Sequence, residues 1–296
     1  MKNERVNVLV GNTPEKSVVY QIAERQKEIL LNYYSHVFMG GEKGGCINLV
    51  HKYGVDVVGS RNVFIFHFDP YDFRHEIPMS ELESYLSLFN IVICLNRKQQ
   101  YFCNIRNIRN TLIPHGSDYE CKRFLGFNNI EKPVVILACD YYRGNVKGED
   151  YFFALSRIMS DHLTFMIVGK GWSECKVKTS TVNIMNVDSY TELKKYFNDA
   201  DIVFIGSRYE AGPASFPDAV NSNKYIMSTP VGMVLDNFIE GESGFFIRFD
   251  LAEDASNLHV VIKKIKDNIS PKYITRYIGW SEQIKEIVGV LNEEFC

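Results

Sequence analysis

Short apolar runs alternate with longer amphipathic stretches along most of the chain. Continuous apolar runs such as Asn62–Phe68 and Val134–Cys139 are typical of strands that are buried on both faces of a parallel sheet. Between such runs, apolar residues recur with helical spacing, as in Met79–Phe89. The pattern therefore predicts an α/β protein in which helices cover both faces of parallel sheets.

The same pattern predicts the individual elements. In the first half we expect helices at Glu15–Tyr34, Cys46–Tyr53, Met79–Phe89 and Lys98–Arg106, and strands at Val6–Val10, from Ser35, and at Asn62–Phe68, Ile91–Leu95 and Thr111–Pro114. In the second half we expect strands at Val134–Cys139, Leu163–Val168, Val182–Met185, Ile202–Ile205, Tyr225–Met227 and Phe245–Ile247. The helices predicted there are Glu149–Met159, Ser189–Asn198, Pro217–Asn223, Ala255–Asn268, Pro271–Ile278 and Trp280–Leu291.

Both halves repeat this alternation, which predicts two Rossmann-like domains facing a cleft. We expect the first boundary between Asp118 and Lys132, with domains at residues 1–120 and 121–278. A chain of 296 residues is long enough for two domains of ordinary size. In open parallel sheets, ligands bind at the carboxyl ends of the strands, so candidate chemistry is expected in the loops that follow them.

Composition narrows the class of protein. The formal net charge of -3 disfavours nucleic acid as a partner, because proteins that bind its backbone usually carry a basic excess. The seven cysteines include no C-x-x-C pair, which indicates reduced thiols in a cytoplasmic protein and predicts no metal site. No apolar run is long enough for a membrane span, and we expect no signal peptide in the N-terminal segment, whose short apolar run is broken by Gly-Asn-Thr-Pro. We expect a cytoplasmic protein, with peripheral membrane contact left open.

The segment Asp201–Phe246 carries the most informative chemistry. A loop of small residues follows the strand at Ile202–Ile205 and leads into a helix; its members include Gly212, Pro213, Ala214 and Ser215. Backbone N–H groups and the helix dipole make such a loop suitable for a diphosphate. Glu210 precedes it and Asp218 lies eight residues later, so both carboxylates can flank one ligand. Alternatively, Asp218 only stabilises its helix through the dipole and Glu210 is merely solvated.

This segment resembles the C-terminal half of the retaining GT-B glycosyltransferases of the group-1 family. Their Glu-x7-Glu motif has its counterpart in Glu210-x7-Asp218, and two later glycine turns, at Gly232 and at Gly241–Gly244, follow in the family's order. Further matches are the segments Ile113–Asp118, Lys147-Gly148, Ile167–Gly171, which contains Gly169, and Tyr277–Ser281. The resemblance covers residues 111–291 well and the first hundred weakly. It implies that residues 279–296 form a helix that crosses back to the first domain.

The resemblance also implies roles. Lys147 would stabilise the charge that develops on the departing β-phosphate without a metal, and Arg143, one position from the family's arginine, would assist it. Glu210 would contact the donor sugar and Asp218 the ribose. The turn at Gly169 would face the nucleotide. Alternatively, Lys147 is only a solvated loop lysine.

Two first-domain features are weaker candidates. Gly41 belongs to a glycine-rich run that either approaches the donor phosphate or the acceptor, or forms a plain turn. His67 ends an apolar strand, where the family often has a histidine near the acceptor; alternatively it is a packed residue. His115 stands where the family often has asparagine.

The function implied is transfer of a sugar, with retention, from a nucleoside diphosphate donor to a saccharide, lipid-linked or other hydroxyl acceptor, with no cofactor. The first half is short and the second acidic residue is Asp, which motivates an alternative: a non-catalytic sugar-nucleotide-binding subunit that supports a partner transferase. Homo-oligomer formation and a sugar-nucleotide epimerase are also compatible with the sequence. A dinucleotide-dependent oxidoreductase is disfavoured, because the first strand lacks a Gly-x-Gly-x-x-Gly loop.

Overall fold

The computed structural model describes residues 2–11, 18–40, 46–57, 59–72, 76–117, 119, 132–141, 144–175, 177, 179–187 and 189–295. The chain forms two compact units. Unit 1 comprises residues 1–116 and 278–296, and unit 2 comprises residues 117–277. Each unit contains a six-stranded sheet whose described strands all pair in parallel. The predicted α/β class is therefore confirmed.

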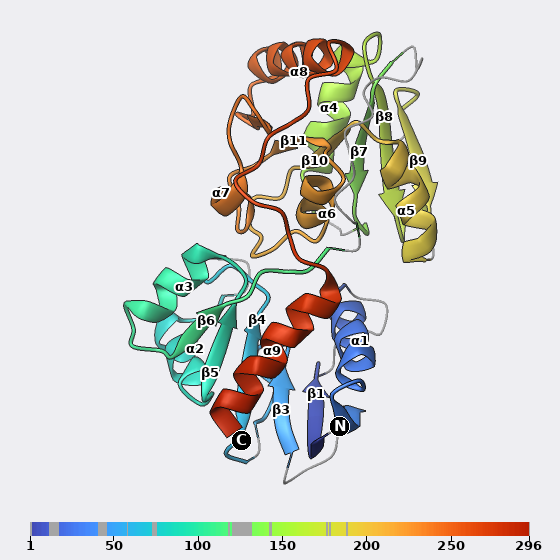
Figure 1. The fold of residues 1–296 in the computed structure, drawn as a ribbon. Helices are drawn as coiled ribbons and strands as arrows, with labels where there is room; N and C mark the ends of the chain where they lie inside the picture. The colour runs from blue at the N-terminus through green and yellow to red at the C-terminus, as the bar shows by residue number, and fades with distance from the viewer. Residues whose placement is uncertain are drawn as a thin grey trace. The chain divides into compact units, whose positions relative to one another are not determined.

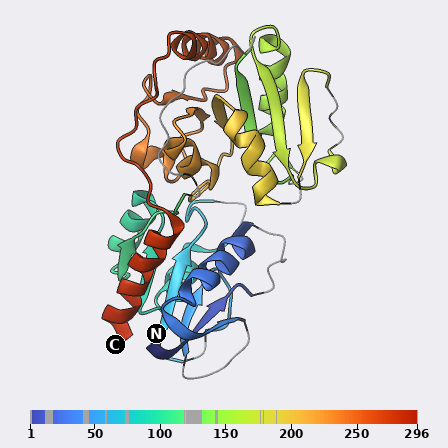
Figure 2. The same ribbon diagram turned by 45° about the vertical axis from the view of Figure 1, so that its right-hand side comes forward.

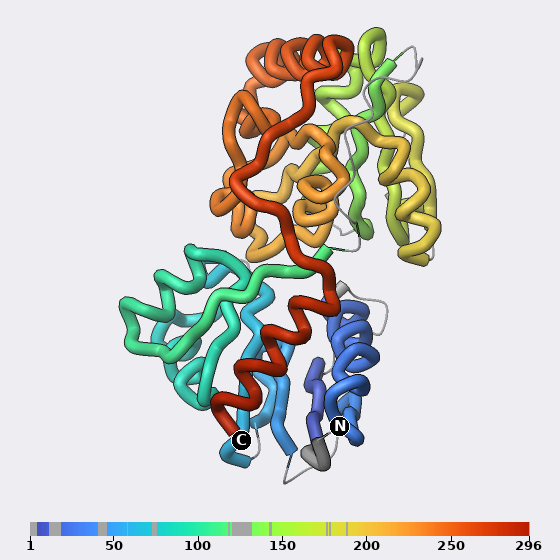
Figure 3. The backbone as a smooth tube through the Cα atoms, in the orientation of Figure 1, coloured from blue at the N-terminus to red at the C-terminus, as the bar shows by residue number. Residues whose placement is uncertain are grey.

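In unit 1 the strands run in the order β2-β1-β3-β4-β5-β6. They are β1 (Lys2–Leu9), β2 (Tyr34–Met39), β3 (Cys46–Val50), β4 (Asn62–Phe66), β5 (Ile91–Cys94) and β6 (Asn110–Leu112). The helices are α1 (Val18–Leu30), α2 (Met79–Leu86), α3 (Arg97–Asn104) and α9 (Trp280–Phe295). The chain first adds β2 on one side of β1 and then continues with β3 on the other, so the strand order reverses between β1 and β3. The last helix, α9, lies beside α1 (Figures 1 and 3).

In unit 2 the strand order is β12-β11-β10-β7-β8-β9, so it reverses between β7 and β10. The strands are β7 (Val134–Ala138), β8 (Thr164–Gly169), β9 (Val182–Asn186), β10 (Ile202–Ile205), β11 (Tyr225–Ser228) and β12 (Gly244–Phe246). The helices are α4 (Glu149–Met159), α5 (Tyr190–Asp199), α6 (Ser215–Asn221), α7 (Val234–Asn237) and α8 (Leu251–Lys266), with a 3₁₀ turn at Trp172–Glu174. Helices α4 and α8 pack on one face of the sheet, and α5 and α6 on the other (Figure 2).

Each unit has its own apolar core. In unit 1 it includes Phe64, Phe66, Leu82 and Phe102, between the sheet and helices α2 and α3. In unit 2 it includes Phe152, Phe165, Phe204, Leu258 and Val261, between the sheet and helices α4 and α8. Burial of these large side chains is the main favourable term for each unit.

A row of buried asparagines crosses three strands of unit 1. Asn48 on β3 stands opposite Asn7 on β1 and opposite Asn62 on β4. The Asn48 amide donates to Asn62 Oδ1 over 2.8 Å, and the Asn7 amide donates to Asn48 Oδ1 over 3.4 Å. A shift of the strand register would separate these amides inside the core, so the row specifies the pairing of the three strands.

Two predicted helices are wrong. The segment Cys46–Tyr53 contains the strand β3, all of whose residues are buried. A short run that is buried on every side contains apolar residues at helical spacing as well as at strand spacing, so the pattern alone did not distinguish the two.

The second error concerns Pro271–Ile278, which is not helical. Its backbone groups pair with side chains of unit 2 instead of with one another. Asn237 accepts from Thr275 N over 2.7 Å and donates to Thr275 O over 2.9 Å. Likewise, Asn221 accepts from Tyr277 N over 2.9 Å and donates to Tyr277 O over 2.8 Å. These amides replace the hydrogen bonds that a helix would have formed.

Candidate functional site

The loops after β7 and β10 meet at the point where the strand order of unit 2 reverses. Lys147 lies in the first loop and Glu210 in the second, and the Lys147 Nζ forms an ion pair with Glu210 Oε1. Both side chains are partly buried, with 24% and 18% of their surfaces exposed. Ligands of open α/β sheets bind outside the carboxyl ends of the strands at this reversal. A cation and a carboxylate thus stand where the topology alone predicts a ligand.

Hydrogen bonds fix both members of the pair. The Ser207 hydroxyl donates to Glu210 Oε1 over 3.1 Å, and the backbone N–H of Lys147 donates to Glu149 Oε2 over 3.0 Å. Glu149 begins α4 and is buried, and that burial raises the pKa of its carboxyl. The sequence places Ser207 in the loop of small and polar residues that follows β10, but its hydrogen bond to Glu210 was not predicted.

Glycines at two positions, 148 and 232, let the backbones of neighbouring loops approach each other closely. A Cβ on Gly148 would stand 2.5 Å from the carbonyl oxygen of Gly206, and one on Gly232 would stand 2.0 Å from the carbonyl oxygen of Ala211. Gly148 and Gly232 also have positive φ angles, of 74° and 42°. The backbone of unit 2 at this edge therefore requires glycine at both positions for steric and conformational reasons.

The predicted small-residue loop lies between β10 and α6. Pro213 is buried, whereas Gly212, Ala214 and Ser215 are partly exposed. The helix begins at Ser215, and Phe216 N donates to Pro213 O over 2.9 Å. No side chain caps the helix start at Ala214, so its first backbone N–H groups are not paired with a capping side chain.

Asp218 in α6 is buried, and both of its carboxylate oxygens accept hydroxyl groups. Ser117 donates to Oδ1 over 2.8 Å and Tyr190 donates to Oδ2 over 2.7 Å. The sequence had not indicated either hydroxyl, because Ser117 and Tyr190 are 101 and 28 residues away. Asp218 is therefore a hydrogen-bonded anchor between α6, the start of α5 and the segment that opens unit 2.

Gly169 ends β8 against the backbone that follows β7. A Cβ at this position would stand 1.9 Å from the carbonyl oxygen of Cys139. The Trp172 indole also donates to that carbonyl over 2.7 Å. Close backbone packing explains the glycine by itself, and a role toward a nucleotide remains a prediction.

Three histidines stack at the carboxyl edge of the sheet of unit 1. His51, His67 and His115 follow β3, β4 and β6, with ring centroids 5.1 Å apart for the first pair and 5.4 Å for the second. His51 Nδ1 and His67 Nε2 share a hydrogen bond of 2.9 Å. Sequence reasoning had selected His67 and noted His115, and it missed His51, which directly follows a buried strand at the strand-order reversal.

Burial keeps these imidazoles neutral. Desolvation lowers the pKa of His51 to about 3 and that of His115 to about 4, and the pKa of His67 is well below its ordinary value for the same reason. The backbone around His67 is held by the buried Gln99, whose amide donates to Phe66 O over 2.6 Å and to Phe68 O over 2.8 Å.

Two predicted site residues, Arg143 and Gly41, lie outside the described residues. Within the described ranges, no group of three or more His, Cys, Asp or Glu side chains is arranged to hold a metal ion. No helix in that part of the chain is both long enough and apolar enough to cross a membrane.

Comparisons with known proteins agree with this architecture. No family model matches the sequence, and no curated protein matches it. Among solved structures, the chain is similar to sucrose-phosphate synthase from Thermosynechococcus elongatus, with a TM-score of 0.65, 11% identity and 99% of each chain covered. It is also similar to WaaG, a glycosyltransferase involved in lipopolysaccharide biosynthesis (TM-score 0.64, 10% identity, 96% of this chain and 95% of that one). A third likeness is to HepE from Anabaena in complex with UDP and glucose (TM-score 0.57, 12% identity, 98% and 100%). The chain therefore has the GT-B glycosyltransferase fold.

Proposed function

We propose that this chain transfers a sugar from a nucleoside diphosphate donor to a hydroxyl acceptor, with retention at the anomeric carbon and without a metal ion. The observation that carries the proposal is the Lys147–Glu210 pair at the strand-order reversal of unit 2. The fold supports it, since one protein of similar structure is in complex with UDP and glucose. Saccharides, lipid-linked glycans and other hydroxyl compounds are the acceptor classes.

The pair suits departure of a nucleoside diphosphate. When the bond from the anomeric carbon to the β-phosphate oxygen breaks, negative charge grows on that oxygen. The Lys147 ammonium, which is partly shielded from water, would stabilise this charge, and Arg143 would add a second cation. Glu210, oriented by Ser207, would accept a hydroxyl of the donor sugar.

The remaining residues would hold the rest of the donor. The loop of Gly212, Pro213, Ala214 and Ser215 would offer its backbone N–H groups to the diphosphate. Asp218 would accept the ribose hydroxyls. Since its oxygens already accept the hydroxyls of Ser117 and Tyr190, a ribose diol would share or replace bonds of the same chemical kind.

In unit 1, His67 is proposed to contact the acceptor and Gly41 to approach the acceptor or the donor phosphate. A neutral imidazole accepts a hydrogen bond from a sugar hydroxyl, and the depressed pKa of His67 keeps that form present at neutral pH. Its hydrogen bond to His51 fixes the ring orientation.

A donor panel tests the proposal. Purified protein is incubated with UDP-, GDP- and ADP-sugars and a mixture of glycan acceptors, and release of the nucleoside diphosphate is measured with and without EDTA. We expect turnover with one nucleotide class that persists in EDTA, and NMR of the product should show the anomeric configuration of the donor. Lys147→Met and Glu210→Gln should each lower kcat by about 100-fold or more.

The matched control is a second ion pair of unit 2. Lys272 and Glu242 lie 3.0 Å apart on the surface, and exposed pairs of this kind contribute little. Lys272→Met and Glu242→Gln should retain wild-type turnover. Binding of nucleotide with no turnover by any donor would overturn the proposal in favour of a binding subunit that supports a partner transferase.

A further inference from the structure

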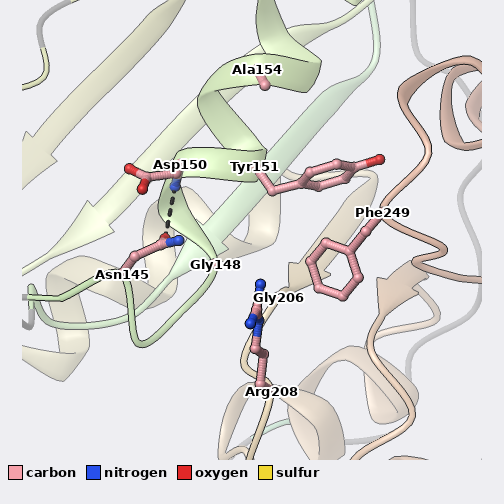
Figure 4. Close-up of a pocket in the computed structure, with 8 residues that line it drawn as sticks. All are labelled: Asn145, Gly148, Asp150, Tyr151, Ala154, Gly206, Arg208 and Phe249. Carbon is pink, nitrogen blue, oxygen red and sulfur yellow. Dashed lines mark hydrogen bonds between the residues drawn. The ribbon is translucent and has the colours of Figure 1, made fainter.

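A pocket lies in unit 2, on the side of the sheet covered by α4 and α8. Its volume is about 270 Å³, and its lining includes Asn145, Asp150, Tyr151, Arg208 and Phe249, with Gly148 and Gly206 contributing backbone. In Figure 4 the aromatic rings of Tyr151 and Phe249 stand on one side, Asn145 and Asp150 on the other, and the Arg208 side chain between them. Neither Lys147 nor Glu210 lines this pocket.

Phe249, which lines this pocket, has an unfavourable backbone conformation. Its φ angle of 59° is in the left-handed region, which a bulky side chain rarely adopts, and 45% of its surface is exposed to water. Strained residues of this kind cluster at ligand sites, where the surrounding structure maintains them.

A single buried carboxylate holds both aromatic walls in place. Asp254 has no exposed surface, and its carboxylate accepts a hydrogen bond from the Tyr151 hydroxyl over 2.6 Å. It also accepts the backbone N–H of Arg248, the residue before Phe249, over 3.1 and 3.2 Å. The Tyr151 and Phe249 rings meet edge to face at 5.1 Å, and the Arg208 guanidinium lies 5.5 Å from the centre of the Phe249 ring. The pocket is therefore preorganised by groups behind its surface.

The contents of the pocket point to one ligand chemistry. Aromatic faces attract the polarised C–H groups of a pyranose ring, while an amide, a carboxylate and a guanidinium together can donate to and accept from its hydroxyls. Asn145 accepts the Asp150 N–H over 2.9 Å. Because Arg208 and Asp150 offset each other in charge, a neutral ring suits the pocket better than an anion. The volume lies just below that of typical sites for drug-sized ligands, about 300–1,000 Å³, which favours one ring over a nucleotide.

We propose that this pocket is a saccharide-binding site for a neutral pyranose ring, separate from the donor site. Its lining takes Asn145 and Gly148 from the loop that carries Lys147, and Gly206 and Arg208 from the loop that carries Glu210, but it includes neither Lys147 nor Glu210. A glycan seated there would be held by unit 2 independently of the nucleotide. The proposal depends on the chemistry of the pocket and stands even if the chain does not transfer sugars.

Ligand-observed saturation-transfer NMR of the full chain tests it, with the methyl glycosides of glucose, galactose, mannose and N-acetylglucosamine as probes. We expect at least one to bind with a Kd of about 1 mM or tighter. Phe249→Gly should abolish the signal without lowering the melting temperature, because glycine tolerates the positive φ. Arg208→Gln, at an exposed position, should weaken binding at least fivefold.

The control is Leu235→Ala, which removes a side chain of unit 2 that is 50% exposed and does not line the pocket; it should bind as the wild type does. Excess UDP should leave the saccharide signal in place. The proposal is overturned if no probe binds, if both pocket variants bind normally, or if UDP displaces the saccharide, since displacement would locate it in the donor site.

Discussion

At the scale of single residues, the candidate site of unit 2 is built on the ion pair between Lys147 and Glu210. Lys147 and Glu210 are 63 residues apart and satisfy each other while both remain partly exposed. A diphosphate would compete with Glu210 for the ammonium, which leaves the carboxylate to accept a sugar hydroxyl. Both residues could be selected from the sequence because each follows a recognisable strand within a family-like motif. Tyr190 and Ser117 could not, because their roles arise from side-chain contacts with a residue that is distant in the sequence.

Gly148→Ala tests how tightly the Lys147 loop is positioned. The added Cβ would stand 2.5 Å from the Gly206 carbonyl oxygen at a φ of 74°, so the loop must move. Displacements near 1 Å cost about 100-fold in rate, and we expect a loss of donor turnover of that order, measured by nucleotide release.

Gly144→Ala is the matched comparison. Gly144 also has a positive φ, of 93°, but a Cβ there would meet no atom of the described residues within 4 Å. This variant should lose about 1–2 kcal/mol of stability through backbone strain and keep its turnover per folded molecule. Equal kinetic losses in both variants would show that strain, and not contact with Gly206, matters for the site.

The histidine stack predicts loss of stability in mild acid. His51 and His115 have pKa values of about 3 and 4 in the folded chain against 6.5 when unfolded, so the unfolded chain binds more protons below pH 6.5. Their contribution to stability is complete above that pH and declines as the pH falls toward 4. Each buried histidine should contribute a slope of up to about 1.4 kcal/mol per pH unit.

Urea unfolding of the wild type and of His115→Asn between pH 7 and pH 5 measures this slope. The variant should show a shallower decline, by up to about 1.4 kcal/mol per pH unit. As a control, Asn183→Ala, at an exposed position that carries no titratable group, should leave the slope unaltered. An unchanged slope in His115→Asn would contradict a neutral imidazole at that position.

At the scale of elements, hydrophobic pattern identified the strands of unit 2 and most helices of both units. The hydrophobic pattern gave the wrong secondary structure where contacts with distant residues, and not the local sequence, determine the conformation of a segment. β3 lies between β1 and β4, and its residues are buried on both faces of the sheet, so it lacks the alternation that would have identified it. Residues 271–277 remain extended because Asn221 and Asn237, which are distant in sequence, bind their backbone.

The asparagine row in unit 1 yields a prediction at this scale. Asn48→Ala removes the amide that donates to Asn62 and leaves that buried oxygen without its partner on β3. We expect a loss of roughly 1–3 kcal/mol, measured by urea unfolding. Asn183→Ala, at an exposed position on β9, should stay within about 0.5 kcal/mol of the wild type. If the two variants lost similar amounts of unfolding free energy, the buried asparagine row would not contribute to stability in the way described.

At the scale of the whole molecule, the two units share one construction: a parallel sheet whose strand order reverses near its middle. In unit 1 the reversal lies between β1 and β3, next to His51, and in unit 2 it lies between β7 and β10, next to Lys147 and Glu210. Strand alternation predicted two such units, but strand order depends on pairing between distant segments and was not readable from the sequence. The strand order explains why Lys147 and Glu210 lie together, because it makes β7 and β10 neighbours and so brings the loops after them side by side.

The central claim is that the Lys147–Glu210 edge of unit 2 binds the diphosphate of a nucleotide donor. Calorimetric titration of the full chain with UDP, GDP and ADP tests it most directly. We predict that one of the three binds, that Lys147→Met weakens binding of that nucleotide by about tenfold or more, equal to about 1.4 kcal/mol, and that Lys272→Met leaves it unchanged. Equal affinity of Lys147→Met and wild type, or no binding of any of the three nucleotides, would contradict the claim.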